Sequence, residues 1–289
     1  MTIEIKKLKP KDFPERLKEI NDPPKELYLR GTLPSPDSKW LCVVGSRKYT
    51  NYGQEACEKL ISGLSGFPIV IVSGLALGID GIAHRAALSA GLKTIAVPGS
   101  GLSPKVLYPA SNLRLSEKIL ESGGALLSEF EPEFKATPWS FPQRNRIMAG
   151  LSDAVLIIEA EIKSGTLITS KMATEYNRDV LAVPGPIFSS TSEGPHMLIR
   201  LGATPITSSA QLLEALGFKA KNGEESGTVR NYSDCSPEEL RIIELLKNPQ
   251  TRDDLIQNLK LPASKVNTTL SILELKGLIR EFMGEIHLT

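Results

Sequence analysis

Along the middle of the chain, short apolar runs rich in β-branched residues alternate with longer segments whose apolar positions recur at helical spacing. Such runs, bounded by glycines, are typical of strands that are buried on both faces of a parallel sheet. The expected strands are 40–44, 68–72, 93–97, 125–128, 154–158 and 180–183, and the expected helices lie near 51–65, 79–91, 111–122, 141–151, 166–177 and 208–216. This alternation predicts an extended Rossmann-like α/β domain, with a mainly parallel sheet and helices on both faces.

The pattern changes on either side of this central region. Residues 1–37 form a polar, proline-punctuated lead-in, with room for one short helix near residues 13–20. The Rossmann-like domain is expected over 38–218, and the polar, aperiodic residues 219–234 are typical of a linker.

Residues 235–289 are expected to form a separate small domain. Ser236 and Pro237 predict the start of a helix that runs through Leu246, because serine caps helices and proline suits the first helical position. Further helices at 251–258 and 262–276, a stop at Gly277 and a β-ribbon over 278–288 complete a winged-helix pattern.

Composition limits the classes of function. The 289 residues include 34 lysines and arginines against 33 aspartates and glutamates, so nucleic-acid affinity would have to come from a local basic patch. The three cysteines lack CxxC spacing and are typical of reduced thiols in a cytoplasmic protein. The three histidines are far apart, and no apolar run approaches the length of a membrane span, so neither a metal site nor membrane insertion is expected.

Two turns at strand ends combine small residues with a cation. Gly45-Ser46-Arg47 follows the first expected strand, and Lys163-Ser164-Gly165-Thr166 follows the fifth. Small residues there let backbone N–H groups approach an anion at a helix N-terminus, and Ser164 or Thr166 is also suited to capping the next helix. The chain has no GxxxxGK[ST] loop and no complete GxGxxG fingerprint, so no nucleotide cofactor is expected.

The segment FPQRNRIMAGLS at 141–152 places Phe141 close before Arg144, Asn145 and Arg146. Arginine binds phosphate oxygens in pairs, and an aromatic ring offers a face on which a base can stack. The alternative is a capped helix whose arginines make structural ion pairs. The segment alone slightly favours that alternative, and the two phosphate-friendly turns shift the balance towards a phosphodiester site.

A third strand-end segment, SGLALGIDGIAH at 73–84, contains Asp80 and His84 at i, i+4 spacing. The two could form an acid–base pair on one helix face. The sequence favours the simpler interpretation, in which Asp80 caps the helix and His84 is a structural histidine.

The order of these segments resembles the DprA/Smf family, the DNA-processing proteins of natural transformation. The similarity rests on VGSRKYTNYG, SGLALGIDGIAHRAAL, TIAVPGSGL, FPQRNRIMAGLSDAVLIIEA and SGTLITSKMATE, and it spans about residues 40–205. The resemblance implies a non-catalytic protein that binds single-stranded DNA, forms a homodimer through the Rossmann-like domain and helps load the RecA recombinase. By position, the implied DNA-binding pocket consists of Ser46, Arg47, Phe141, Arg144, Asn145, Arg146 and Lys163. Ser164 and Gly165, in the turn after the fifth strand, complete the nine residues of the predicted site.

The sequence departs from the family pattern at two places. Gln143 stands where a basic residue is common, which predicts a less cationic pocket, and TSEGPH at 191–196 replaces a more usual turn.

Two competing functions remain. One is a Rossmann-like nucleotide phosphoribohydrolase, of whose PGGxGTxxE motif the chain carries only the fragments at 98–101 and 164–166. The other is a sequence-specific repressor head. Its recognition helix at 262–276 has no arginine and only Asn267 suits base readout, so the tail is interpreted as a protein-interaction or auxiliary module.

Overall fold

The computed structural model describes residues 4–218, 234–246, 248–259, 261–282 and 284–288. The chain divides into two compact units, Met1–Ser226 and Gly227–Thr289. The expected linker at 219–234 lies, apart from Asp234, outside the described residues.

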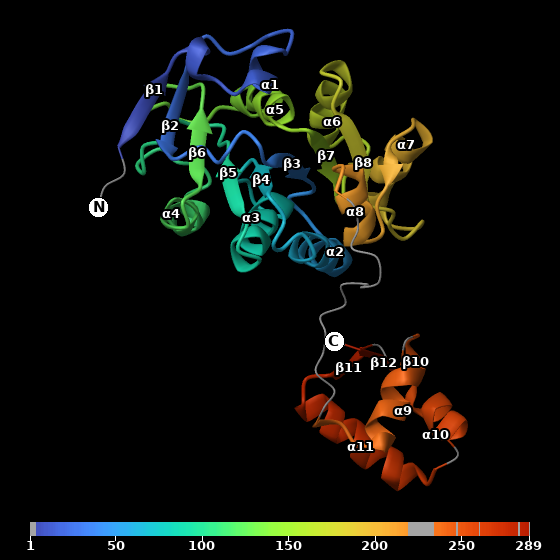
Figure 1. The fold of residues 1–289 in the computed structure, drawn as a ribbon. Coiled ribbons are helices and arrows are strands. Elements are labelled where there is room, and N and C mark those ends of the chain that lie inside the picture. The colour runs from blue at the N-terminus through green and yellow to red at the C-terminus, as the bar shows by residue number, and fades with distance from the viewer. Residues whose placement is uncertain (1–3, 219–233, 247, 260, 283, 289) are drawn as a thin grey trace. The chain divides into compact units, whose positions relative to one another are not determined.

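The first unit is built on one nine-stranded sheet with the strand order β1-β2-β6-β5-β4-β3-β7-β8-β9 (Figure 1). The strands are β1 (Ile5–Leu8), β2 (Leu27–Gly31), β3 (Lys39–Val44), β4 (Ile69–Ser73), β5 (Lys93–Ala96), β6 (Ala125–Ser128), β7 (Ala154–Ile157), β8 (Asp179–Ala182) and β9 (Thr204–Pro205). All pairs from β6 to β9 are parallel, whereas β1 and β2 add to the edge of β6 as antiparallel strands.

Helices cover both faces of the sheet. They are α1 (Glu15–Lys18), α2 (Asn51–Ser62), α3 (Ile79–Ser89), α4 (Leu113–Glu121), α5 (Ser140–Leu151), α6 (Thr166–Glu175), α7 (Glu193–Arg200) and α8 (Ser209–Ala215). Strand β3 shows the principle: Leu41 and Val43 pack against α2 and α3, while Cys42 and Val44 pack against α5. Figure 1 shows α2, α3 and α4 on one side of the sheet and α1, α5 and α6 on the other. The doubly covered parallel sheet is the one that the sequence predicts.

The lead-in is part of this sheet, which the sequence did not predict. Residues 1–37 supply β1 and β2, and only a four-residue α1 stands where the short helix was expected. Strand β2 covers an otherwise open edge, which lowers the risk of unwanted strand pairing. An ion pair also fixes the lead-in to the domain, because Arg16 Nη2 lies 2.5 Å from Asp153 Oδ1.

The second unit has the winged-helix arrangement predicted for the tail. It comprises α9 (Pro237–Leu245), β10 (Gln250–Thr251), α10 (Arg252–Leu259), α11 (Ala263–Leu275), β11 (Ile279–Phe282) and β12 (Glu285–Leu288). Ser236 and Glu239 form a reciprocal capping box at the start of α9, and Gly277 follows α11 with a φ of 68°. Within the described part of the chain, every helix is too short or too polar to cross a lipid bilayer.

Candidate nucleic-acid interface

A pocket of about 680 Å³ lies where the strand order of the sheet reverses. From β3 the sheet grows through β4, β5 and β6 in one direction, and from β7 through β8 and β9 in the other. Connections therefore diverge at the carboxyl ends of β3 and β7, which is where open α/β sheets bind ligands. The turns after β3 and β7 line the pocket together with α5.

The turn after β3 is held mainly by the protein's own packing. A methyl group on Gly45 would lie 2.7 Å from Ile79 Cγ1, so glycine is needed for α3 to approach. Ser46 Oγ donates a hydrogen bond to Lys48 O at 2.8 Å and accepts one from Lys48 N at 3.0 Å. The turn thereby leaves Arg47 exposed, with its guanidinium carbon 5.2 Å from the ring centroid of Phe141.

The turn after β7 is more open. Ser164 Oγ accepts a hydrogen bond from Thr166 N at 3.2 Å, and Thr166 Oγ1 donates to Gly45 O at 3.2 Å, which joins the two turns. The cap differs in detail from the one expected, because Gly165 precedes α6 and Ser164 Oγ accepts only from the N–H of Thr166, the first residue of the helix. No protein atom lies within 4 Å of a methyl group placed on Gly165. Since packing does not require a glycine there, its open face is available to a ligand.

Helix α5 forms one wall of the pocket. Phe141 packs over Gly99, where a methyl group would come within 2.6 Å of its ring, and its centroid lies 5.7 Å from that of Tyr108. Asn145 is buried and donates a hydrogen bond from Nδ2 to Gly165 O at 3.4 Å. Asn145 therefore aligns α5 with the turn after β7.

Arg144 is seated beneath this wall. It is 4% exposed, and its Nη1 donates to Val97 O at 2.6 Å. Gly74 makes room for it, because a methyl group there would lie 1.6 Å from Nη1 and 2.5 Å from Asp80 Oδ2. Burial raises the pKa of Asp80 and lowers the pKa of Arg144, and in each case the charge of the other group acts in the opposite direction. Each group thus favours the ionised form of the other.

The structure does not bring Arg146 into the pocket. Its guanidinium forms an ion pair with Glu129, donates to Asp22 O and lies 3.6 Å from the Asp22 carboxylate. Helical spacing explains the difference, because two residues along a helix point to different faces. Gln143 interacts with Glu129 and is absent from the pocket lining, so its departure from the family pattern does not make this pocket less cationic.

Asp80 does not cap α3, which corrects the sequence interpretation. The helix begins at Ile79 after Gly78, and the Asp80 carboxyl lines the pocket. His84 has the structural position expected for it: Nδ1 lies 2.7 Å from Thr94 Oγ1, and burial lowers the pKa of the ring to about 3. An acid–base pair with Asp80 is not needed to explain either residue.

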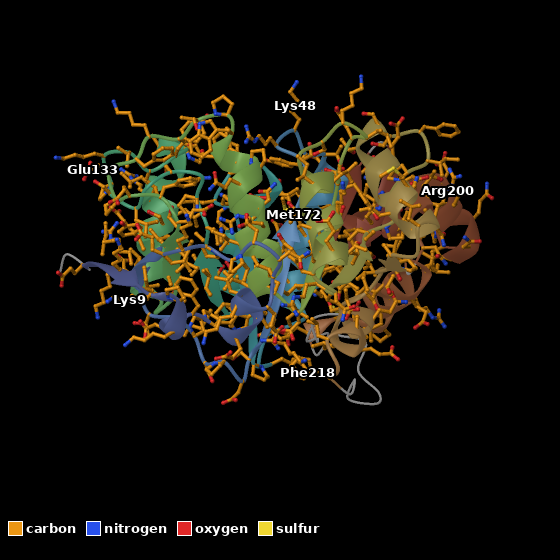
Figure 2. The ribbon with its side chains drawn as sticks, turned by 90° about the horizontal axis from the view of Figure 1, so that it is seen from above. Lys9, Lys48, Glu133, Met172, Arg200 and Phe218 are labelled. Carbon is orange, nitrogen blue, oxygen red and sulfur yellow. The ribbon has the colours of Figure 1, made fainter. Side chains whose placement is uncertain are left out.

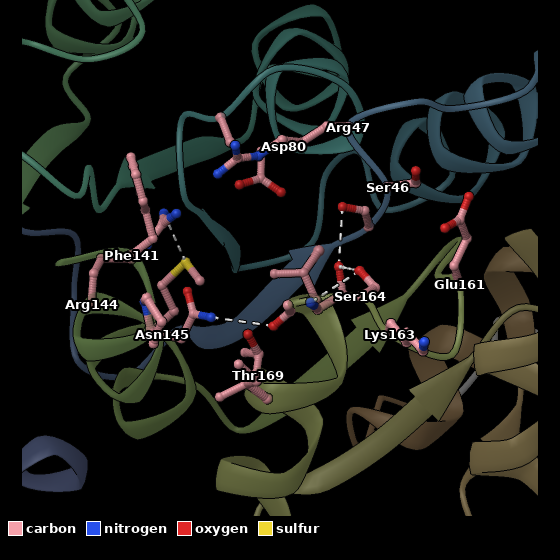
Figure 3. Close-up of a pocket in the computed structure, with 18 of the residues that line it drawn as sticks. Ser46, Arg47, Asp80, Phe141, Arg144, Asn145, Glu161, Lys163, Ser164 and Thr169 are labelled. Carbon is pink, nitrogen blue, oxygen red and sulfur yellow. Dashed lines mark hydrogen bonds between the residues drawn. The ribbon is translucent and has the colours of Figure 1, made fainter. Parts of the chain in front are cut away.

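Figure 3 shows the resulting pocket, with Arg47, Arg144 and Lys163 reaching it from three different segments. Its lining carries four cations and two carboxylates. Three of these charged residues, Lys48, Asp80 and Glu161, were not predicted from the sequence to belong to the site. Eight of the nine predicted site residues line it: Ser46, Arg47, Phe141, Arg144, Asn145, Lys163, Ser164 and Gly165. Asp80 could have been suspected as a charged residue beside a strand-end glycine turn.

Comparison with known proteins decides the family. The model of the DNA recombination-mediator protein A family matches residues 5–217. The chain belongs to this family. A second model, the DprA winged helix domain, matches residues 228–284, and together they confirm the resemblance and the fold class inferred from the sequence.

Relatives are similar along most of their length. Protein Smf of Escherichia coli is 39% identical over 94% of this chain and 74% of its own, and DNA processing protein DprA of Streptococcus pneumoniae is 45% identical over 71% and 72%. The solved S. pneumoniae DprA structure has a TM-score of 0.67 at 41% identity, covering 73% of this chain and 74% of its own. A Helicobacter pylori structure, described for its single-stranded DNA binding mode, has a TM-score of 0.65 at 30% identity, covering 74% and 96%.

Proposed function

We propose that this protein binds single-stranded DNA in the pocket above β3 and β7, without strong sequence preference and without catalysing a reaction. The observation that carries the proposal is the convergence of Arg47, Arg144 and Lys163 on an open cavity at the point where the strand order reverses. Arginine forks and backbone N–H groups at helix starts suit phosphate oxygens. The residues that line the pocket do not form an array that could read base edges in a groove.

Single strands fit this site better than duplex DNA. Arg144 and Asn145 are buried at its base, so a ligand has to enter the cavity, and an unpaired strand can turn a phosphate and a base inwards. Phe141 lies beside Arg47 at the rim, where a base could stack. The H. pylori relative, whose structure is described for its single-stranded DNA binding mode, supports the proposal.

A salt titration of labelled oligonucleotides tests this proposal. Log affinity for a single strand should fall linearly with log salt concentration, with a slope of about 2–3, because four cations line the pocket and each neutralised phosphate contributes about 0.7. Homopolymers of different bases should bind within a few-fold of one another. Affinity that is independent of salt, or that is equal for duplex DNA, would contradict the proposal.

The same preparation tests the wider role. We propose that the protein acts as a homodimer and helps load RecA onto the strand it holds, as the family resemblance implies. RecA assembly on single strands covered by a single-strand-binding protein should accelerate when this protein is added, and Arg47→Ala should remove that acceleration. Release of a free base from nucleoside monophosphates by purified protein would instead favour the phosphoribohydrolase alternative.

A further inference from the structure

Exposed aromatic side chains lie along one edge of the sheet, the one formed by the carboxyl ends of its parallel strands. Five aromatic residues are exposed among those that the structure describes, and all five follow the carboxyl end of a strand or start the helix after it. They are Tyr49, Tyr52, Tyr108, Trp139 and Phe188. The described connections at the opposite edge of the sheet carry none, so the distribution is one-sided.

Burial of these rings would ordinarily stabilise the fold, so their exposure needs a reason. Phe188 is 97% exposed and Trp139 is 55% exposed, although Trp139 lies beside the buried ring of Phe130. Ile187, next to Phe188, is 77% exposed. The other described aromatic rings are buried or partly buried, whereas these five lie exposed at the edge that also holds the pocket.

Several of the exposed rings are held in place. Trp139 makes edge contacts with Phe130 and Phe134, at centroid separations of 5.7 and 5.6 Å. The Tyr52 hydroxyl donates to Pro184 O, which fixes Tyr52 to the connection that carries Phe188. A ring that is already immobile loses little entropy when a ligand stacks on it. These rings therefore suit stacking better than freely moving side chains would.

The rings extend on both sides of the pocket. Trp139 follows β6 and Tyr108 follows β5, whereas Tyr49 and Phe188 follow β3 and β8. Five strand steps separate β6 from β8, which corresponds to roughly 24 Å at about 4.8 Å a step. The aromatic edge is therefore long enough for several nucleotides.

We propose that these five side chains form a stacking track for the bases on either side of the nucleotide in the pocket. The proposal rests on the proposed function, and it adds that the strand runs along the whole carboxyl edge of the sheet. Base–aromatic stacking tolerates any base, as a binder without sequence preference requires. Continuity with the cationic pocket favours this occupant, since Lys48 projects from the same edge (Figure 2).

Charge distinguishes the track from the pocket. Glu131 and Glu133 lie in the same connection as Trp139, and Lys135 is the cation there. The track is therefore suited to bases rather than to phosphates on that side. Removing a ring should weaken binding without changing the salt slope, because no phosphate contact is lost.

Tryptophan fluorescence reports on the track directly. The chain has two tryptophans, and Trp40 is only 3% exposed, so a bound base can quench Trp139 alone. We expect quenching by an oligonucleotide of about 16 nucleotides and little by a dinucleotide, because the shorter strand fills the pocket only. In Trp139→Phe the remaining fluorescence should not respond. Binding of the longer strand without quenching of Trp139 would overturn the track on that side.

A length series with Phe188→Ala tests the other side. The variant should bind the longer strand about fivefold or more weakly, and the shorter strand as wild type does. Leu201→Ala is the matched control, because Leu201 is 76% exposed at the opposite end of the sheet, between α7 and β9, and should leave both affinities unchanged. Equal binding of the longer strand by Phe188→Ala and wild type would overturn the inference while leaving the pocket intact.

Two further outcomes are separable. Failure of both strands to bind the wild type would refute the proposed function itself. A changed molar mass of Phe188→Ala in light scattering would assign Phe188 to contact between copies of this chain, and would also overturn its place in the track.

Discussion

Helix α5 carries a buried arginine on each of two faces, and the two arginines differ in their contacts. On the pocket face, Arg144 lies beneath the cavity and donates to a backbone carbonyl while Asp80 balances its charge. On the far face, Arg146 is paired with Glu129 and with Asp22 of the lead-in. Both arginines are less than 9% exposed, so burial alone would not tell them apart.

The difference lies in what each arginine can still reach. Arg146 is buried with a carboxylate partner, whereas Arg144 forms no ion pair with any described carboxylate and donates to a backbone carbonyl instead. Asp80 is near enough to influence its pKa but does not form an ion pair with it. Two arginines of one motif can therefore have different roles, one in binding and one in folding. The segments that each arginine contacts in the folded chain decide which role it has.

The largest expected effect comes from the far face. Arg146→Ala leaves the Glu129 carboxyl buried without its partner, which should lower the free energy of unfolding by about 3–5 kcal/mol. Affinity for a single strand, measured where the variant is still folded, should match wild type. Denaturant unfolding and a binding titration measure the two effects. A loss of affinity without a loss of stability would place Arg146 in the site and remove the distinction between the two faces.

The next effect is expected at the pocket rim. Arg47→Ala should lower single-strand affinity by about 1.5–3 kcal/mol, the usual contribution of hydrogen bonds to charged groups. The salt slope should fall by about 0.7. Thermal melting should hardly change, because the side chain is exposed.

Arg47→Lys is the matched control for geometry. It keeps the charge and loses the planar fork, so it should recover affinity only in part. Wild-type binding by Arg47→Ala in folded protein would leave Arg144 and Lys163 as the cations that hold the strand.

A comparable effect is expected for the aromatic ring of Phe141, which lies beside Arg47. Phe141→Ala should weaken binding by about 1–3 kcal/mol if a base stacks there. Because Phe141 also packs over Gly99 and Tyr108, some loss of stability should accompany it. Melting and binding are therefore measured together. A lower melting temperature with unchanged single-strand affinity would show that Phe141, like Arg146, stabilises the fold and does not bind DNA.

Local patterns in the sequence predicted most of the parallel sheet and the position of the pocket. Apolar runs bounded by glycine predicted the strands from β3 to β8, and Ser46 and Gly165 predicted where anions could approach. The antiparallel strands β1 and β2 were missed, because their proline-rich surroundings do not show that β2 pairs with β6 and β1 with β2. The strand β6, to which both are added, is distant in the sequence.

The role of Arg146 could not be separated from that of Arg144 for the same reason. The carboxylates that decide it, Glu129 and Asp22, come from a strand end and from the lead-in. Asp80 was assigned to a cap because its spacing suits one, whereas the fold places Gly78 before the helix instead. Long-range contacts determined each of these outcomes.

The smallest effect is expected at Gly165, one of two glycines in the turns that line the pocket. Gly165→Ala should change the free energy of unfolding by less than about 1 kcal/mol, because the gain from a stiffer unfolded chain opposes the loss of a glycine before a helix. Its methyl group meets no protein atom within 4 Å, so any loss of single-strand affinity comes from the ligand side. Gly45→Ala is the contrasting variant, since its methyl group would lie 2.7 Å from Ile79 Cγ1 and should cost about 1–3 kcal/mol of stability. Weaker binding by Gly165→Ala at unchanged melting temperature would show that the turn after β7 is open for DNA. Unchanged binding would mean that the strand enters from the side of Arg47 alone.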